Sequence, residues 1–153
     1  MAESRFHYVI YIRTTREALW EALTLPELTR IYWVQCWHDT TWQKGAVWEV
    51  ILPDGRVGDS GEILEAVQPS RIVLKWRNEF VPDLRAEGYS RCTIQLDQVG
   101  DAVKLSITHS IDVADSKLIA AVSTGWPMIM SSLKSMIETG EALAETRLWP
   151  KGI

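Results

Sequence analysis

Apolar and polar residues alternate along much of the middle of the chain. Residues 71–77, 89–97 and 102–111 place an apolar side chain at nearly every second position. Because successive side chains of a β-strand point to opposite faces, this period of two predicts strands with one buried face. Only short turns separate several of these segments, whereas parallel neighbours need long crossover connections, so we expect an antiparallel sheet.

Two further strands are predicted over residues 45–52 and 57–67. The segment Pro53-Asp54-Gly55-Arg56 between them has the composition of a tight turn. Gly58 and Gly61 interrupt the second strand, and glycine within a strand marks a bulge or sharp curvature. We therefore expect the sheet to bend in this region.

The chain begins with a predicted strand over residues 6–12, rich in β-branched and aromatic side chains, and two short helices follow it. Thr14, with Glu17 three residues later, has the spacing of a capping box at the start of the first helix. Thr24 is expected to cap the second helix, with Pro26 in its first turn, where a missing N–H costs little.

A long helix is predicted near the end of the chain. Apolar residues recur every three or four positions from Leu118 to Ile137, which is the period of an amphipathic helix. Asp115 is the expected N-cap, and Gly140 either ends the helix or weakens it. Pro127 has no N–H to donate and is expected to kink the helix. The order of elements predicts an α+β fold, in which a curved antiparallel sheet grips the terminal helix.

Length, composition and charge narrow the class of protein. The 153 residues suit a single domain, with a core over about 6–145 and a tail over 146–153 that no pattern places. The net charge of −4 argues against a nucleic-acid partner. No apolar run approaches the roughly 18 residues of a membrane span, and the first residues lack a signal-peptide pattern. We expect a cytoplasmic protein in which Cys36 and Cys92 are reduced core thiols.

Tryptophan is unusually frequent, with eight residues against four tyrosines and two phenylalanines. An indole is large, and its N–H needs a partner when it is buried. Eight indoles are easier to place around a hollow than in a close-packed core, so we predict a cavity for a small hydrophobic or aromatic molecule. Ordinary core packing is the alternative for each indole. The expected cavity residues are Trp33, Trp37, Trp48, Glu65, Trp76, Ile107, His109, Trp126 and Met130.

Two titratable residues are predicted to point inward. Alternation with Ile107 turns His109 to the inner face, and counting forward from Ile63 does the same for Glu65. His109 is either hydrogen-bonded within the core or a polar anchor for a ligand. Glu65 either forms a salt bridge or contacts a ligand in acid–base work. The polar loop over 78–88 is either solvated or a lid over the cavity.

No residue pattern indicates a metal or another cofactor. The three histidines, His7, His38 and His109, form no HxxH or HExxH motif, and we expect no metal site. His38 and Asp39 are adjacent, which places their side chains on opposite faces of a strand. The Gly-x-Ser-x-Gly signature of a hydrolase nucleophile is absent from the sequence.

An ordered set of motifs resembles a known superfamily. The motifs are TTREALWEALT at 14–24, Pro26-Glu27-Leu28, Tyr32-Trp33, Gly45-x-x-Trp48, GEILEAVQPSRIVLKW at 61–76, LSITH at 105–109, Gly125-Trp126-Pro127 and SSLK at 131–134. Together they resemble the START/Bet v 1-like (SRPBCC) superfamily over about residues 6–145. The similarity is to the bacterial branch named after the activator of the heat-shock protein 90 ATPase.

The resemblance implies a helix-grip fold with a cavity between sheet and long helix. It does not imply one activity, because the superfamily includes lipid carriers, hormone binders, aromatase/cyclases and chaperone activators. We expect a binding protein without catalysis of its own. A chaperone cofactor or other interaction module remains open, as does a cyclase- or dehydratase-type enzyme that uses His109 and Glu65. A regulator partner and a homodimer are further expectations, the latter because Trp20 is predicted to lie exposed at a rim or interface.

Overall fold

The structure is a computed structural model that describes residues 2–149. Its elements in chain order are β1 (Ser4–Ile12), α1 (Arg16–Thr24), α2 (Pro26–Tyr32), β2 (Trp37–Asp39), β3 (Val47–Ile51), β4 (Val57–Val67), β5 (Arg71–Asn78), α3 (Pro82–Arg85), β6 (Ser90–Val99), β7 (Ala102–Ile111), α4 (Lys117–Thr139) and the 3-10 helix η1 (Ala144–Thr146).

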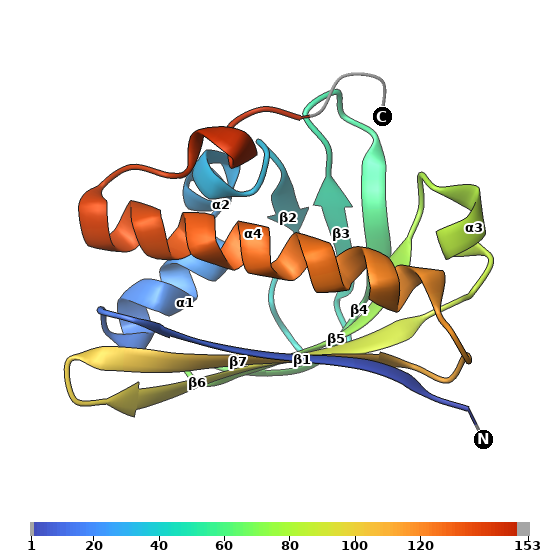
Figure 1. The fold of residues 1–153 in the computed structure, drawn as a ribbon, viewed down its shortest axis with the longest axis horizontal. Coiled ribbons are helices and arrows are strands. Elements are labelled where there is room, and N and C mark those ends of the chain that lie inside the picture. Colours follow the sequence, from blue (N-terminus) through green and yellow to red (C-terminus); the bar gives the residue numbers. More distant parts are fainter. Residues whose placement is uncertain (1, 150–153) are drawn as a thin grey trace.

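All seven strands form one sheet in the order β1-β7-β6-β5-β4-β3-β2. Every neighbouring pair is antiparallel, which confirms the sheet predicted from the alternation. The sheet curves strongly: β1, β7 and β6 lie beneath α4 in Figure 1, while β2, β3 and β4 rise behind it. This arrangement is the predicted α+β, helix-grip fold.

Glycine allows the curvature at two positions of β4. Val50 pairs with Asp59 and Ile51 with Val57, so Gly58 is an extra residue that forms the expected bulge. Gly61 allows a close approach instead, because a Cβ there would lie 1.7 Å from the carbonyl oxygen of Lys75 on β5.

The start of α4 differs from the prediction by one residue. Ser116 is the N-cap, and its hydroxyl accepts the Ile119 N–H at 3.1 Å. Asp115 precedes the cap with a φ of 49°, so the expected Asp115 cap is wrong. The helix runs through Pro127 as one continuous element (Figure 1), and Gly140 ends it with a φ of 88°.

The caps of α1 and α2 also differ from the predicted residues. Thr15, rather than Thr14, caps α1, and its hydroxyl accepts the Ala18 N–H at 3.2 Å. Leu25 is the N-cap of α2 and makes no side-chain bond there. The Thr24 hydroxyl instead donates to a carbonyl within α1. The first prediction was wrong because Thr14 and Thr15 can both cap a helix, and sequence spacing alone does not choose between them. The second was wrong because α1 extends through Thr24, which leaves Leu25 as the residue before α2.

Trp20 is buried, with only 5% of its surface exposed, which corrects its predicted place at a rim or interface. It lies in the core with Leu19 and Leu23 of the same helix. The homodimer expected from an exposed Trp20 therefore loses that support.

The tail begins by folding back onto the α2–β2 connection. The Val34 N–H donates to the Thr146 carbonyl at 2.8 Å, and the buried Thr146 hydroxyl bonds to Ser132 of α4. The tail is described through Trp149, and the remainder of the predicted segment 146–153 lies outside the described residues. Among the helices of residues 2–149, none is long and apolar enough to cross a membrane.

Glu87 connects the loop after β5 to the start of α4. Its carboxylate accepts hydrogen bonds from the Ser116 hydroxyl at 2.6 Å, from the Lys117 N–H at 2.7 Å and from the Leu118 N–H at 3.3 Å. A carboxylate at this place satisfies N–H groups that have no partner within the helix and interacts favourably with the helix dipole.

Replacing Glu87 with alanine is therefore expected to lower the free energy of unfolding by about 1–2 kcal/mol, measured by urea unfolding. The matched control is Asp83→Ala, which removes an exposed ion pair with Lys117 at 3.2 Å. Such surface pairs contribute about 0–1 kcal/mol, so the control should change stability less. Equal effects of the two substitutions would contradict the capping role of Glu87.

Candidate functional site

Aromatic side chains fill much of the space between the sheet and α4. The ring centroid of Trp76 lies 4.6 Å from that of Trp48, 5.3 Å from that of His109 and 5.6 Å from that of Trp126. Trp48 and His109 are fully buried. For Trp48 and His109 the structure supports the core-packing alternative.

Two buried histidines are each held by an indole. Trp126 Nε1 donates to His109 Nδ1 at 3.2 Å, and Trp48 Nε1 donates to His38 Nδ1 at 2.9 Å. Because an indole N–H can only donate, each Nδ1 must accept, and the ring proton of each neutral histidine sits on Nε2. Burial lowers the pKa of His109 to about 4 and that of His38 to about 3. Both rings are therefore neutral near pH 7.

The two histidines differ at Nε2. His109 Nε2 donates to the Ser90 hydroxyl at 2.8 Å, and that hydroxyl donates to the Trp76 carbonyl at 2.9 Å. Both nitrogens of His109 are thus engaged inside the core. His38 Nε2 is buried and has no hydrogen-bond partner among the described residues.

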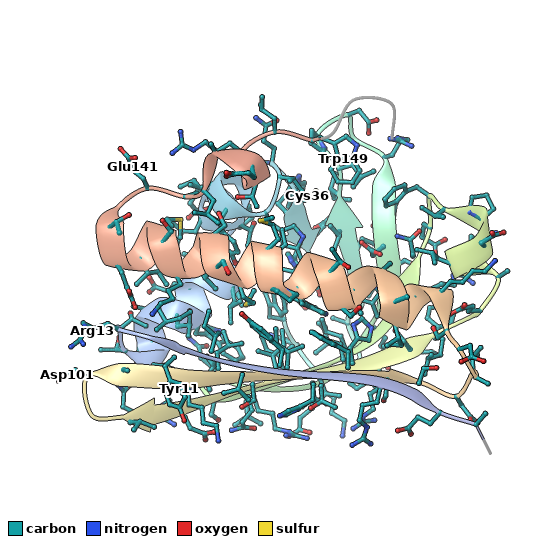
Figure 2. The ribbon with its side chains drawn as sticks, in the orientation of Figure 1. Tyr11, Arg13, Cys36, Asp101, Glu141 and Trp149 are labelled. Carbon is teal, nitrogen blue, oxygen red and sulfur yellow. The ribbon has the colours of Figure 1, made fainter. Side chains whose placement is uncertain are left out.

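A pocket of about 190 Å³ remains beside this cluster, between α4, the strands β3–β5 and the tail. We call it the α4 pocket. Five aromatic residues line it, namely Trp33, Trp76, Phe80, Trp126 and Trp149. Figure 2 shows Trp149 and a further lining residue, Cys36, close to β3 on the same side of the molecule. Ala121 and Gly125, one turn apart on α4, form part of its wall.

Asp59 supplies the carboxylate of the α4 pocket. Its Oδ1 accepts hydrogen bonds from Trp76 Nε1 at 2.9 Å and from Asn78 Nδ2 at 3.3 Å. Burial raises the pKa of Asp59 to about 7; the two hydrogen bonds oppose this shift, and the nearby charge of Glu79 adds to it. Asp59 forms no ion pair with any residue in the range 2–149.

Asp59 is not among the predicted cavity residues, although the alternation of side chains along β4 places it on the inner face. Val50 opposite Asp59 and Ile63 four residues later are both buried on the inner face of the sheet. Counting backward from Ile63 in steps of two would have reached Asp59. Counting forward reached Glu65, and that direction fails.

Glu65 does not lie in the pocket, which corrects its predicted inward orientation. Ile63 pairs with Leu74 and Glu65 with Val73, so Leu64 is an extra residue and the alternation reverses after it. The Glu65 carboxylate forms an ion pair with Arg71 at 3.3 Å, and 42% of its side chain is exposed. The salt-bridge alternative describes Glu65 correctly.

The other predicted cavity residues fall into three groups. Trp33, Trp76 and Trp126 line the α4 pocket. Trp48, Ile107, His109 and Met130 are buried in the core but do not line the pocket. Trp37 lies elsewhere, half-buried, with its ring 5.1 Å from the Arg30 guanidinium.

The loop over 78–88 is partly ordered by its own contacts. It contains α3, and Phe80 and Leu84 from this loop line the α4 pocket. The role of a lid stays a prediction.

In the described part of the chain, no group of three or more His, Cys, Asp or Glu residues is placed to hold a metal ion.

Several proteins of known structure share this fold. A search of the curated proteins returned no match. Among solved structures, CalU16 from Micromonospora echinospora is 20% identical with a TM-score of 0.71, over 93% of this chain and 78% of its own. The dimeric Aha1 from Colwellia psychrerythraea is 17% identical with a TM-score of 0.71, over 91% and 99%. An HSP90 activator from Plasmodium falciparum is 20% identical with a TM-score of 0.69, over 86% and 94%.

Identities at this level show a common fold and nothing more specific. The family model described as "Activator of Hsp90 ATPase homolog 1-like protein" matches residues 13–138, which is most of the chain. The match covers strands β2 to β7, helices α1 to α3 and all but the last residue of α4, and it begins just after β1. The chain therefore belongs to the family of Activator of Hsp90 ATPase homolog 1-like proteins.

Proposed function

We propose that this protein binds a small, flat, largely apolar molecule in the α4 pocket. The observation that carries the proposal is the set of five aromatic side chains around about 190 Å³ of open space. Such a concave apolar site with few polar groups is the usual form of a small-molecule pocket.

The volume limits the size of the ligand. Pockets for drug-sized ligands span about 300–1,000 Å³, so the α4 pocket is smaller. A cavity of about 150 Å³ is large enough for benzene. A single ring with one or two small substituents therefore suits the space.

An enzymatic role for His109 and Glu65 is less well supported. The two side chains lie on different faces of the sheet, since Glu65 pairs with Arg71 while His109 is fully buried. Both ring nitrogens of His109 already have partners within the core. We therefore propose binding without catalysis by this pair.

The proposal is tested with benzyl alcohol and phenol as neutral single-ring probes. Trp33, Trp76 and Trp126 lie in the wall of the pocket, so binding should change the tryptophan fluorescence in a saturable manner. Because a ligand that binds only the folded state stabilises it, the melting temperature should also rise with probe concentration.

A blocking variant is provided by Gly125. Gly125 lines the pocket, and a Cβ built at this position meets no atom within 4 Å, so a larger side chain fits there without a clash. Gly125→Leu should weaken probe binding at least about tenfold, whereas the matched control Gly125→Ala should keep it. The proposal would be refuted if neither probe bound saturably, or if Gly125→Leu bound the probes as tightly as the parent protein does.

A further inference from the structure

We propose that the ligand of the α4 pocket is a small organic cation, an aryl or alkyl ammonium, whose charge is held by the Asp59 carboxylate and the surrounding aromatic rings. The inference rests on the proposed function and specifies its ligand class. It depends on three features of the pocket: a carboxylate with hydrogen bonds on one oxygen only, the lack of an ion-pair partner for it among residues 2–149, and the aromatic rings in the wall.

The carboxylate is only partly used within the protein. Both of its hydrogen bonds, from Trp76 and from Asn78, end on Oδ1. Oδ2 accepts no hydrogen bond from the described residues. These two donors fix the orientation of the carboxylate while leaving one oxygen for a ligand.

The basic residues around the pocket are committed to other carboxylates. Arg77 and Arg85 both bond to Glu79, at 2.5 Å and 3.2 Å. The Arg56 guanidinium bonds to Asp54 at 2.7 Å. None of these three guanidinium groups forms an ion pair with Asp59.

The other described residues in the wall add no positive charge. The wall from α4 consists of apolar residues such as Leu118, Val122 and Ile129. Within residues 2–149, the one other titratable side chain in the wall is Cys36. Its pKa is raised to about 12 by burial and by the charges of Asp59 and Asp54, so the thiol is neutral. An unpaired carboxylate in such surroundings is costly, and a cationic ligand would remove that cost.

The rings are arranged to surround a cation. The ring planes of Trp33 and Trp126 meet at 73°, and those of Trp76 and Trp126 at 70°. Phe80 and Trp149 meet at 64° on another side of the pocket. Rings in several orientations thus line the pocket, and a cation is attracted to the face of an aromatic ring. A carboxylate combined with indole faces is therefore suited to an ammonium group.

The test compares two probes of nearly equal shape, benzylamine in its ammonium form and benzyl alcohol, by calorimetry at pH 8. The ammonium should bind at least about tenfold more tightly than the alcohol. Asp59→Asn keeps an oxygen that can accept from Trp76 and Asn78 but removes the charge. It should weaken ammonium binding at least about tenfold and weaken alcohol binding far less, because the alcohol carries no charge.

Two controls make the result specific. Asp83→Asn removes an exposed carboxylate next to Leu84 in the pocket wall and should affect neither probe. Lowering the pH from 8 to 6 protonates Asp59, which has a pKa of about 7, and should weaken ammonium binding to the parent protein but not to Asp59→Asn.

The outcomes separate the inference from the proposed function. If the alcohol binds as tightly as the ammonium, or if Asp59→Asn binds the ammonium as tightly as the parent does, the inference is overturned and the proposed function stands. If neither probe binds, both are overturned. Selective ammonium binding that Asp59→Asn abolishes would support both.

Discussion

Replacing Gly61 with alanine is expected to lower the free energy of unfolding by roughly 3 kcal/mol, near the upper end of the cost of overpacking. The added Cβ would lie 1.7 Å from the Lys75 carbonyl oxygen and 2.6 Å from the Lys75 carbonyl carbon. These are backbone atoms of β5, and Lys75 is paired with Glu62 on one side and with Arg91 on the other. The strand cannot move away without disturbing both of its neighbours.

The measurement is urea unfolding of the variant beside Gly125→Ala. At Gly125 the new Cβ meets no atom within 4 Å, and the position is helical. Alanine should stabilise the protein there by about 0.5–1 kcal/mol, because glycine is a poor helix former. If the free energy of unfolding of Gly61→Ala instead lies within about 1 kcal/mol of the parent value, β4 and β5 are less closely packed than described.

Asp59→Asn is expected to stabilise the protein at pH 8 by roughly 2–4 kcal/mol and to leave stability nearly unchanged at pH 4. Burial raises the pKa of Asp59 from 3.8 to about 7 in the folded state. Between these two values the folded state binds more protons than the unfolded state, so this residue's contribution to stability falls as the pH rises. Above pH 7 the half-buried carboxylate carries its full cost, which asparagine avoids. The lower end of the range applies if solvent in the pocket screens the charge.

Denaturant unfolding of both proteins at pH 4, 6 and 8 measures the effect. The difference in stability between variant and parent should grow with pH and level off above pH 7. The pH 4 measurement is the internal control, because the parent carboxyl is protonated there. A difference that stays constant across this range would mean that the Asp59 carboxylate is well solvated.

The sequence predicted the fold because the fold depends on patterns that many residues share. The alternation in the segments that became β5, β6 and β7 sets the buried face of each strand, and single exceptions do not change it. Individual caps were less predictable. Thr15 and Ser116 each stand beside another residue able to do the same work, and only the final backbone path decides between them.

The sequence predicted a pocket lined by tryptophans, but only some of the predicted residues line it. Alternation shows which face a residue occupies, and it correctly turned Trp76 and His109 inward. It does not show whether that residue meets open space or another side chain, since depth depends on how the sheet curves around α4. The alternation also does not reveal the bulge at Leu64, which turns Glu65 away from the inner face. The acidic residue in the pocket is therefore Asp59 and not Glu65.

The order of strands also constrains how the protein is made. β1 is synthesised first, yet its partner is β7, with Ser4 opposite Ile111. On the ribosome, where translation adds about 5–20 residues per second, β1 must wait without its partner until β7 (Ala102–Ile111) has emerged. Its apolar residues Phe6, Tyr8 and Ile10 are accessible throughout that wait. The nascent chain is thus most vulnerable to aggregation before its sheet can close, and such long-range pairing slows folding.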